Sequence, residues 1–384
     1  MHLFASFVAG ITLLIYLFAG LEFTLNRRKI ERLDRVPPIG DAEAPRISVI
    51  VPACNEERNI EEALASVLAQ DYPDFEVIAV DDRSTDSTGT ILNRMAVCGL
   101  RLRVIHLRRL PAGWLGKNNA LQQGAAHANG RLLLFTDADV VFERSVLRRA
   151  AAYFENHALD HLAIPPRAIV HGFLSNAFVA VFALLFGMHT KPWKVRDPKA
   201  REHIGIGAFN MVRASAYWKA GGHAPIAMRP DDDMKLGKLL KLCGYRSDMV
   251  IGTRLLSVEW YASFAEMRRG LMKNLFAGVD YQVSLVILFS LLQLVFLVWP
   301  FVGLFVGRGA VQALNAAIVL ALCITFIVNA RAVGISWWWC LSLPLGALIS
   351  VYLLVRAATL TLKNGGIEWR GTKYPLAQLR ANRL

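Results

Sequence analysis

The chain has 384 residues, of which 54% are hydrophobic and 19% are charged. Soluble proteins usually have about a quarter of their residues charged, so this composition argues against a purely soluble protein of roughly two domains. The net charge is +13, and the positive residues gather beside apolar stretches, which favours anionic lipid headgroups over nucleic acid as their partner. The five cysteines are scattered without a zinc-like spacing, which is typical of a reducing compartment.

Residues 1–26 predict a retained membrane anchor. Leu3 to Leu21 carries no charge and is about long enough to cross a bilayer. A cleaved signal peptide is the alternative, but it would carry its positive charges before the apolar run and a small-residue cleavage site after it. We therefore expect the N-terminus outside and the next residues in the cytosol, where the positive charges are Arg27, Arg28, Lys29, Arg32 and Arg35.

Residues 27–45 contain three prolines and a glycine and are interpreted as a linker. Beyond them, apolar runs bounded by turn residues alternate with segments of helical spacing. This alternation predicts an α/β fold with a mostly parallel sheet covered on both faces, whose ligands bind at the carboxyl ends of the strands. Strands are expected at Ile47–Val51, Glu76–Val80, Arg103–Leu107 and Leu132–Thr136, with helices at Glu57–Gln70 and Asn118–Ala128.

The uncharged segment 172–189 interrupts this soluble pattern. We expect it to be a helix that lies in the membrane interface near the functional site, with a buried core helix as the alternative. A membrane span is the least favoured interpretation, because it would move the following residues across the membrane.

Residues 281–362 are predicted to form C-terminal transmembrane helices, because the only charged residues among them are three arginines. The apolar runs are Val283–Val306, Ala310–Ala330 and Ile335–Leu362. Three plain crossings would place the basic tail, residues 363–384, outside the cell, against the positive-inside tendency. Pro344 and Gly346 offer the alternative that the last run is a re-entrant pair, and the sequence leaves both possibilities open.

Acidic residues follow the first two predicted strands. The first strand leads into V-P-A-C-N-E-E, which places Asn55 and Glu56 at its carboxyl end, where a simple helix cap is the alternative. The second strand ends in Asp81 and Asp82. Two adjacent buried acids are costly unless something binds them, so we expect Asp82 to be free to bind a ribose or a base edge.

The fourth strand ends in T-D-A-D, with Asp137 and Asp139 two residues apart. Hard oxygen ligands of this kind suit Mg²⁺ or Mn²⁺. Upstream, Lys117 opens a helix after a glycine-containing turn, a position that is unfavourable for the helix dipole. A bound diphosphate would compensate for it, whereas a solvated surface lysine is the plain alternative.

Asp231, Asp232 and Asp233 precede a predicted helix. Acids at a helix start are ordinary partners of the helix dipole, but three in a row exceed what a cap needs. One of them is therefore a candidate general base.

These motifs, V-P-A-C-N-E-E, V-D-D-R-S-T-D-S-T, W-L-G-K-N-N-A-L, T-D-A-D and D-D-M-K-L-G, resemble in type and order those of inverting family 2 glycosyltransferases with the GT-A fold. The resemblance covers about residues 45–280, and we assign the GT-A domain to 46–280. The membrane layout is most similar to that of hopanoid-associated, carotenoid and ceramide glycosyltransferases. The resemblance implies a cytosol-facing enzyme of the cell membrane that moves one sugar from a nucleotide-sugar donor, expected to be a UDP-sugar, to a membrane lipid acceptor.

The resemblance also implies roles for individual residues. The residue matching Asp139 binds the metal with Asp137 nearby, and the residue matching Asp233 is the base. Asp232 stands beside it, where many members have glutamate. Arg269 is expected at the diphosphate or at lipid headgroups. The expected donor contacts are Pro52, Ala53, Asn55, Glu56, Asp82, Lys117, Asp137 and Arg269.

Several alternatives remain open. Processive polysaccharide synthases carry Q-x-x-R-W after the base, but Glu266–Asn274 lacks both Gln and Trp. A polyprenyl phosphate acceptor would need no strong base. An inactive sugar-nucleotide sensor, a membrane scaffold and a nucleotidyltransferase are further possibilities, and intact acids at all three motifs argue against the first two.

Overall fold

A computed structural model describes residues 2–99 and 101–384. The chain forms two compact units. The helical unit comprises the residues up to Ile30, Val170–Trp193 and Trp260–Asn364. The α/β unit comprises Glu31–Ile169, Lys194–Glu259 and Gly365–Leu384.

The main sheet of the α/β unit is mostly parallel at its centre. β1 pairs in parallel with β2 and β4, and β2 pairs in parallel with β3, whereas β8 runs antiparallel to both of its neighbours. The four strands expected from the sequence are therefore confirmed. The strand order is β3 (Leu102–Leu107), β2 (Phe75–Asp82), β1 (Ile47–Ala53), β4 (Leu132–Phe135), β8 (Asn210–Arg213), β6 (His161–Ala163) and β9 (Ser247–Met249).

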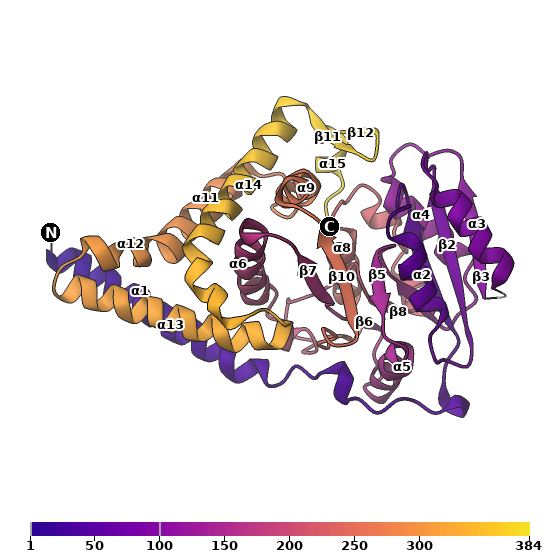
Figure 1. Cartoon of the computed structure of the whole chain (residues 1–384), viewed down its shortest axis with the longest axis horizontal. Helices are drawn as coiled ribbons and strands as arrows, with labels where there is room; N and C mark the ends of the chain where they lie inside the picture. The colour runs from indigo at the N-terminus through magenta and orange to yellow at the C-terminus, as the bar shows by residue number, and fades with distance from the viewer. Residues whose placement is uncertain (1, 100) are drawn as a thin grey trace. The chain divides into compact units, whose positions relative to one another are not determined.

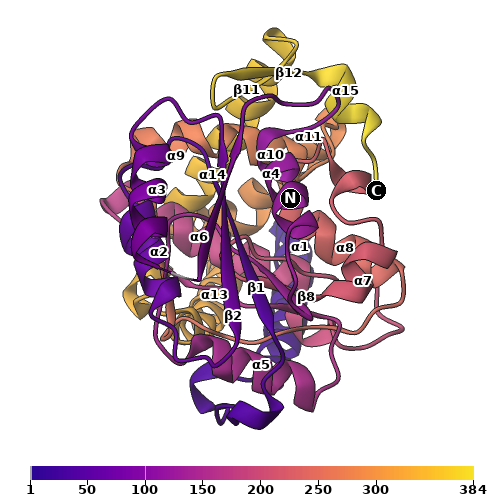
Figure 2. The same cartoon turned by 90° about the vertical axis from the view of Figure 1, so that its right-hand side faces the viewer.

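Helices cover both faces of this sheet, as the apolar character of its strands requires. Val49 and Val51 of β1 pack in one hydrophobic cluster with α2 and α5, and Ile50 packs in another with α4, α7 and α8. Figure 2 shows α2 and α3 on one side of β1 and β2, with α4, α7 and α8 on the other. These helices are α2 (Ile60–Leu68), α3 (Thr88–Cys98), α4 (Gly116–Ala126), α5 (Val146–Asn156), α7 (Ala214–Lys219) and α8 (Asp232–Leu242).

A smaller sheet has the strand order β5 (Val140–Phe142), β10 (Leu256–Tyr261) and β7 (Arg167–Val170). β5 pairs antiparallel with β10. It begins directly after the T-D-A-D motif, so this short turn between β4 and β5 fixes the position of both aspartates.

The C-terminal segment folds within the α/β unit. The sequence identifies residues 363–384 only as a basic tail, whereas in the structure they contain β11 (Gly366–Trp369), β12 (Thr372–Pro375) and α15 (Leu376–Ala381). β11 and β12 form an antiparallel hairpin, drawn in yellow in Figure 1. Asn382 hydrogen-bonds the backbone of Met228 and Pro225, which anchors the end of the chain on the loop before α8.

The helical unit is built around apolar helices. α13 lies along α1 and α12, and α14 packs on α6, α10 and α11, as Figure 1 shows for α1, α12 and α13. A π-helical segment, Leu294–Val298, joins α11 to α12. The helices are α1 (His2–Arg27), α6 (Phe173–Thr190), α9 (Phe264–Gly270), α10 (Met272–Ala277), α11 (Val283–Gln293), α12 (Trp299–Val306), α13 (Ala310–Val333) and α14 (Leu343–Lys363).

Within residues 2–99 and 101–384, five helical stretches are long and apolar enough to cross a membrane. They differ in how much of each is buried inside the protein. The stretches within α1, α11–α12 and α13 are 17%, 28% and 28% buried, but those of α6 and α14 are 44% and 50% buried. The first three therefore present most of their apolar surface outward, as lipid-facing helices do, whereas close to half of the α6 and α14 stretches is buried inside the protein.

Candidate active site

The strand order places the site at one edge of the main sheet. β1 lies between β2 and β4, and the crevice at such a reversal of strand order is where parallel sheets bind ligands. Asn55, just beyond β1, has a left-handed backbone with φ 56°. Its side-chain oxygen accepts from Thr85 N at 2.8 Å, and its N–H donates to Ser84 Oγ at 3.1 Å. Asn55 therefore links the ends of β1 and β2, next to Pro52 and Ala53 in β1.

Asp82 at the end of β2 is engaged by its neighbour. Arg83 donates to both carboxylate oxygens, at 2.8 and 3.0 Å, and Asp82 is buried. A Cβ at Gly116 would collide with Asp82 Oδ2, so this glycine is what allows the start of α4 to approach the acid. The sequence predicts a free carboxylate, but in the structure Arg83 binds it, because a motif does not determine the direction of the adjacent side chain.

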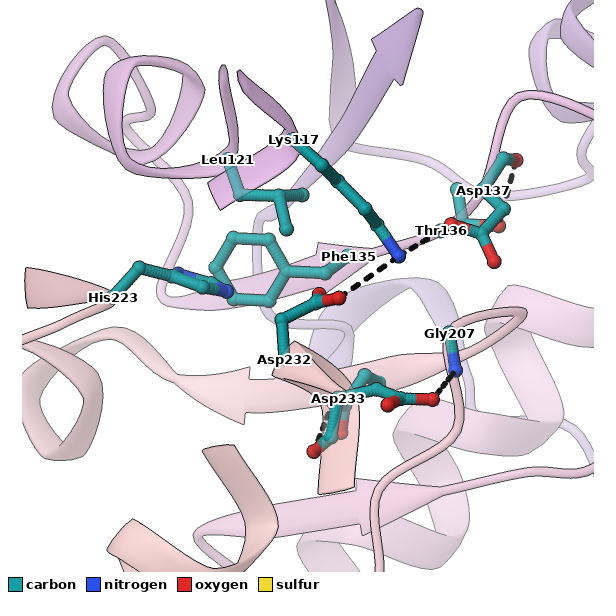
Figure 3. A pocket seen from close by; sticks show the side chains of 10 residues that line it. Lys117, Leu121, Phe135, Thr136, Asp137, Gly207, His223, Asp232 and Asp233 are labelled. Atoms are coloured by element: carbon teal, nitrogen blue, oxygen red, sulfur yellow. Dashed lines mark hydrogen bonds and ion pairs between the residues drawn. The ribbon is translucent and has the colours of Figure 1, made fainter. Parts of the chain in front are cut away.

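Lys117 on the first turn of α4 lies between two acids from other elements. Its Nζ is 2.8 Å from Asp137 Oδ1 and 3.3 Å from Asp232 Oδ1, as Figure 3 shows. Burial alone would lower the pKa of this lysine, but Asp137, Asp232 and Asp233 together raise it above its ordinary value. Lys117 is therefore a fixed cation in the site and not a solvated surface lysine.

The T-D-A-D motif is held by the loop before β8. Thr136 Oγ1 donates to Ala208 O at 2.8 Å, and Asp137 N donates to Gly207 O at 3.0 Å. Burial, followed by the charges of Asp137 and Glu56, raises the pKa of Asp139 to about 7. Burial is the largest cause because it disfavours the charged form, and the two neighbouring acids add to it, so carboxylates gather around Asp139.

This excess of carboxylate oxygen fits a hard divalent cation. In the described part of the chain, no group of three or more His, Cys, Asp or Glu side chains could hold a metal by itself. Mg²⁺ is commonly held by one or two carboxylates together with substrate phosphates. Asp137 and Asp139 therefore fit a metal whose remaining ligands come from a bound phosphate compound.

Asp233 is positioned by backbone groups. Its Oδ2 accepts from Gly207 N and its Oδ1 from Met234 N, both at 2.8 Å. Burial and then the neighbouring Asp232 raise the pKa of Asp233 to about 7, with Lys117 opposing them and Asp137 adding a smaller upward effect. The result is a half-buried carboxylate that changes protonation near neutral pH.

Glycines bring α8 and the loop before β8 into backbone contact. A Cβ at Gly205 would collide with the carbonyl oxygen of Asp233, and a Cβ at Gly237 with that of Ile204. The D-D-M-K-L-G motif therefore combines an acid with the glycine that allows the loop to reach it.

Asp231 has a different role from its two neighbours. It lies at the N-cap of α8 and accepts from Arg229 Nε and Nη2, both at 2.9 Å. The Arg229 side chain is 1% exposed, so Asp231 is the counter-ion of a buried arginine. The sequence suggests a surface or cap position and does not reveal this pair.

The pocket around these residues has an apolar wall. His223 Nδ1 and Tyr217 Oη lie 2.7 Å apart, and burial, followed by the charge of Lys117, lowers the pKa of His223 to about 3. The histidine is therefore neutral. Gly207, Asn210 and His223 are among the residues that line the pocket, and Figure 3 labels Gly207 and His223.

Two arginines, Arg370 and Arg269, lie outside the acidic motifs. Arg370, which the sequence assigns only to a basic tail, forms an ion pair with Glu56. No local motif signals this contact between residues so far apart in the chain. Arg269 lies on α9 in the helical unit, so its expected contact with the donor or with headgroups stays a prediction.

Residues 48–221 match the family model described as "Glycosyl transferase family 2". The 4,4'-diaponeurosporenoate glycosyltransferase of Staphylococcus haemolyticus is 27% identical over 261 residues, which cover 67% of this chain and 68% of that protein. The protein of the same name from Staphylococcus aureus is 23% identical over 339 residues, which cover 86% of this chain and 89% of that protein. A solved mannosyltransferase of Pyrobaculum calidifontis, in complex with GDP-Man and Mn2+, aligns over 98% of this chain and 97% of that chain, with TM-score 0.49 and 19% identity.

The matched region contains the strand ends that carry Glu56, Asp82 and Asp137. It also contains Lys117 and the glycine-containing turn before it. The mostly parallel sheet and the apolar helices at both ends of the chain agree with the GT-A-like architecture expected from the motifs. The relatives extend over most of the chain, beyond the matched domain. Residues 48–221 therefore match a family 2 glycosyltransferase domain, and the relatives that extend beyond it are named glycosyltransferases.

Proposed function

We propose that the protein transfers one sugar from a nucleotide-sugar donor, expected to be a UDP-sugar, to a hydroxyl group of a membrane lipid, with inversion at the anomeric carbon. The observation that supports this most is Asp233, a half-buried carboxylate whose pKa is raised to about 7, beside Lys117 and the T-D-A-D motif. A general base works best when its pKa lies near the operating pH. Asp233 has that property.

In the proposed reaction, the acceptor hydroxyl attacks the anomeric carbon on the face opposite the leaving group. Asp233 accepts the hydroxyl proton. The bond between the anomeric carbon and the diphosphate oxygen breaks, and its electron pair leaves with the nucleoside diphosphate. One displacement inverts the configuration, so no nucleophile from the protein is needed.

Lys117 and the first turn of α4 provide positive charge for the departing diphosphate, because backbone N–H groups at a helix start favour anions. Asp137 and Asp139 are the proposed ligands of Mg²⁺ or Mn²⁺. When bound, such an ion neutralises charge on the leaving diphosphate. Asn55, Glu56 and the residues beside them at the ends of β1 and β2 form the proposed nucleoside side of the donor site.

A lipid acceptor is supported by the helices that can cross a membrane and by relatives named for a 4,4'-diaponeurosporenoate acceptor. That name denotes a carboxylate, and a polyprenyl phosphate would likewise reach the site as an anion. An anionic acceptor needs no base. The raised pKa of Asp233 favours the hydroxyl acceptor over both.

We further propose that the α/β unit faces the cytosol at the cell membrane. Five positive residues lie within residues 27–35, at the last residue of α1 and directly after it, and positive residues favour the cytosolic side. Residues 365–384 fold within the α/β unit, so the C-terminus lies on the same side as the sheet. The segment 260–364 then crosses the membrane an even number of times, which α11–α12 and α13 satisfy as a pair.

The metal assignment is tested by binding and by turnover. Because two carboxylates are too few ligands, Mn²⁺ should bind far more tightly in the presence of the cognate nucleoside diphosphate than alone, measured by calorimetry on the full-length protein. Excess chelator should abolish transfer, and added Mg²⁺ or Mn²⁺ should restore it. Asp139→Ala should lose the nucleotide-dependent metal binding. Full transfer in excess chelator would exclude the metal role.

The acidic run is tested by paired variants. Asp233→Asn cannot accept the proton, so kcat should fall about 10²–10⁴-fold, with donor binding nearly unchanged because the donor contacts lie on other elements. Asp231→Asn should lower kcat less than about tenfold but cost about 1–3 kcal/mol of stability, since Arg229 loses a charged partner. Asp232→Asn should lie between them. Steady-state kinetics and thermal unfolding separate the two effects.

The pH dependence gives an independent check on Asp233. The carboxylate must be deprotonated to act, so kcat should rise with pH through an apparent pKa near 7, and this limb should be absent in Asp233→Asn. If Asp233→Asn retains wild-type turnover, the acceptor is an anion, and the lipid-hydroxyl proposal is wrong.

The product is tested directly in membranes. Membranes from expressing and non-expressing cells are incubated with a panel of labelled nucleotide sugars, and extracted lipids are examined by mass spectrometry. We expect a new lipid that carries one added hexose in the expressing sample alone, and none with Asp233→Asn. A ladder of longer products would instead establish a processive synthase.

Topology is tested by cysteine labelling in variants with a single cysteine. The exposed Cys243 in the α/β unit and a cysteine appended after Leu384 should both resist an impermeant thiol reagent in intact cells and react after permeabilisation. Arg308→Cys, in the connection between α12 and α13, is the matched control and should react from outside. Labelling of Cys243 and the appended cysteine from opposite sides would contradict the even number of crossings.

A further inference from the structure

The C-terminal hairpin has an unusual residue at its turn. β11 and β12 are joined by Arg370 and Gly371, which both have left-handed backbones, with φ 50° and φ 74°. A two-residue turn with two positive φ values strongly prefers Asn or Gly at its first position. A long side chain in this conformation is strained, and such strain persists at functional positions. Arg370 therefore occupies this turn against the local backbone preference.

The Arg370 side chain is directed to the strand ends that form the site. Its guanidinium pairs with Glu56, which follows β1, and 34% of the side chain is exposed. Burial alone would lower the pKa of Arg370, but Glu56 and, with smaller effects, Cys54 and Asp137 raise it. The positive charge thus acts on groups beyond the ends of both β1 and β4, where the proposed donor binds.

The hairpin is held against the catalytic elements at several points. Tyr374 Oη accepts from Gly116 N at 3.2 Å, at the start of α4, and Thr372 Oγ1 accepts from Arg83 at 3.4 Å. On the other side of the segment, the carbonyl oxygen of Leu384 accepts from Lys238 of α8 at 2.7 Å. The turn is therefore a fixed part of the site.

We propose that Arg370 is a donor-binding residue whose guanidinium moves from Glu56 to the phosphate oxygens of the nucleotide sugar. This inference rests on the proposed nucleotide-sugar transfer. A guanidinium carries five N–H donors in a planar fork that matches phosphate oxygens, and a pair with a single carboxylate oxygen uses few of them. Glu56 then holds Arg370 in the site until the donor arrives.

Arg370→Asn removes the guanidinium but should leave the turn intact. Asn suits a left-handed backbone, so the hairpin and the melting temperature should be retained or improved. Loss of a charged hydrogen-bonding partner should weaken binding of the nucleoside diphosphate about 10- to 100-fold. Binding of the corresponding nucleoside, which lacks phosphate, should change by less than about twofold. Arg370→Lys, which keeps the charge but not the fork, should fall between wild type and Arg370→Asn.

Lys373→Asn is the matched control, because it removes one exposed positive charge from the same hairpin and should change either affinity by less than about twofold. The measurement is calorimetry on the full-length protein in detergent with Mg²⁺, using UDP, GDP, ADP and CDP and then the nucleoside of whichever binds. Wild-type protein that binds none of the four would defeat the proposed function.

Wild-type binding that Arg370→Asn leaves unchanged would overturn the role of Arg370 alone. Equal losses with Lys373→Asn would show a general effect of positive charge and would also overturn it. Unchanged nucleotide affinity together with weaker binding of Arg370→Asn protein to anionic vesicles would assign Arg370 to lipid headgroups instead.

Discussion

The structure depends on how negative charge is balanced at one edge of a parallel sheet. Carboxylates from the ends of β1, β2 and β4 and from the start of α8 lie together there, and desolvated like charges are costly unless cations accompany them. Each of these groups is paired with a cation, which comes from the adjacent residue in one case and from a different segment in the others. Arg83 binds Asp82, Lys117 lies between Asp137 and Asp232, and Arg370 pairs with Glu56.

This balance is incomplete at two positions, and both are where the chemistry is proposed. Asp139 and Asp233 each have a pKa raised to about 7, first because burial disfavours their charged forms and then because other acids lie close to them. At Asp139 the excess charge suits a metal ion that arrives with phosphate. At Asp233 it suits a proton from the acceptor. Asp231, two residues before Asp233, is instead neutralised by a buried arginine. The position of an acid within Asp231–Asp233 therefore decides whether its role is structural or chemical.

The sequence predicts the elements around the site well, because buried parallel strands appear as apolar runs that end in turn residues and acids. It also predicts that the acids after the first, second and fourth strands lie together, since the carboxyl ends of neighbouring strands meet. It does not predict the partner of a charged side chain. The Arg83–Asp82, Arg229–Asp231 and Arg370–Glu56 pairs depend on side-chain directions or long-range packing that no local pattern contains.

The folding of residues 365–384 within the α/β unit also constrains the number of membrane crossings. A folded sheet lies wholly on one side of a bilayer, so each segment that leaves the α/β unit and returns to it must cross an even number of times. The segment Val170–Trp193 is shorter than the roughly 40 residues that two helical crossings need. We therefore propose that α6 does not cross the membrane, although its length and apolar character would permit it to do so. In the segment that ends at Asn364, α11–α12 and α13 form the proposed pair of crossings. On this proposal α14 lies within or beside the membrane without crossing it. It returns the chain to the hairpin that carries Arg370.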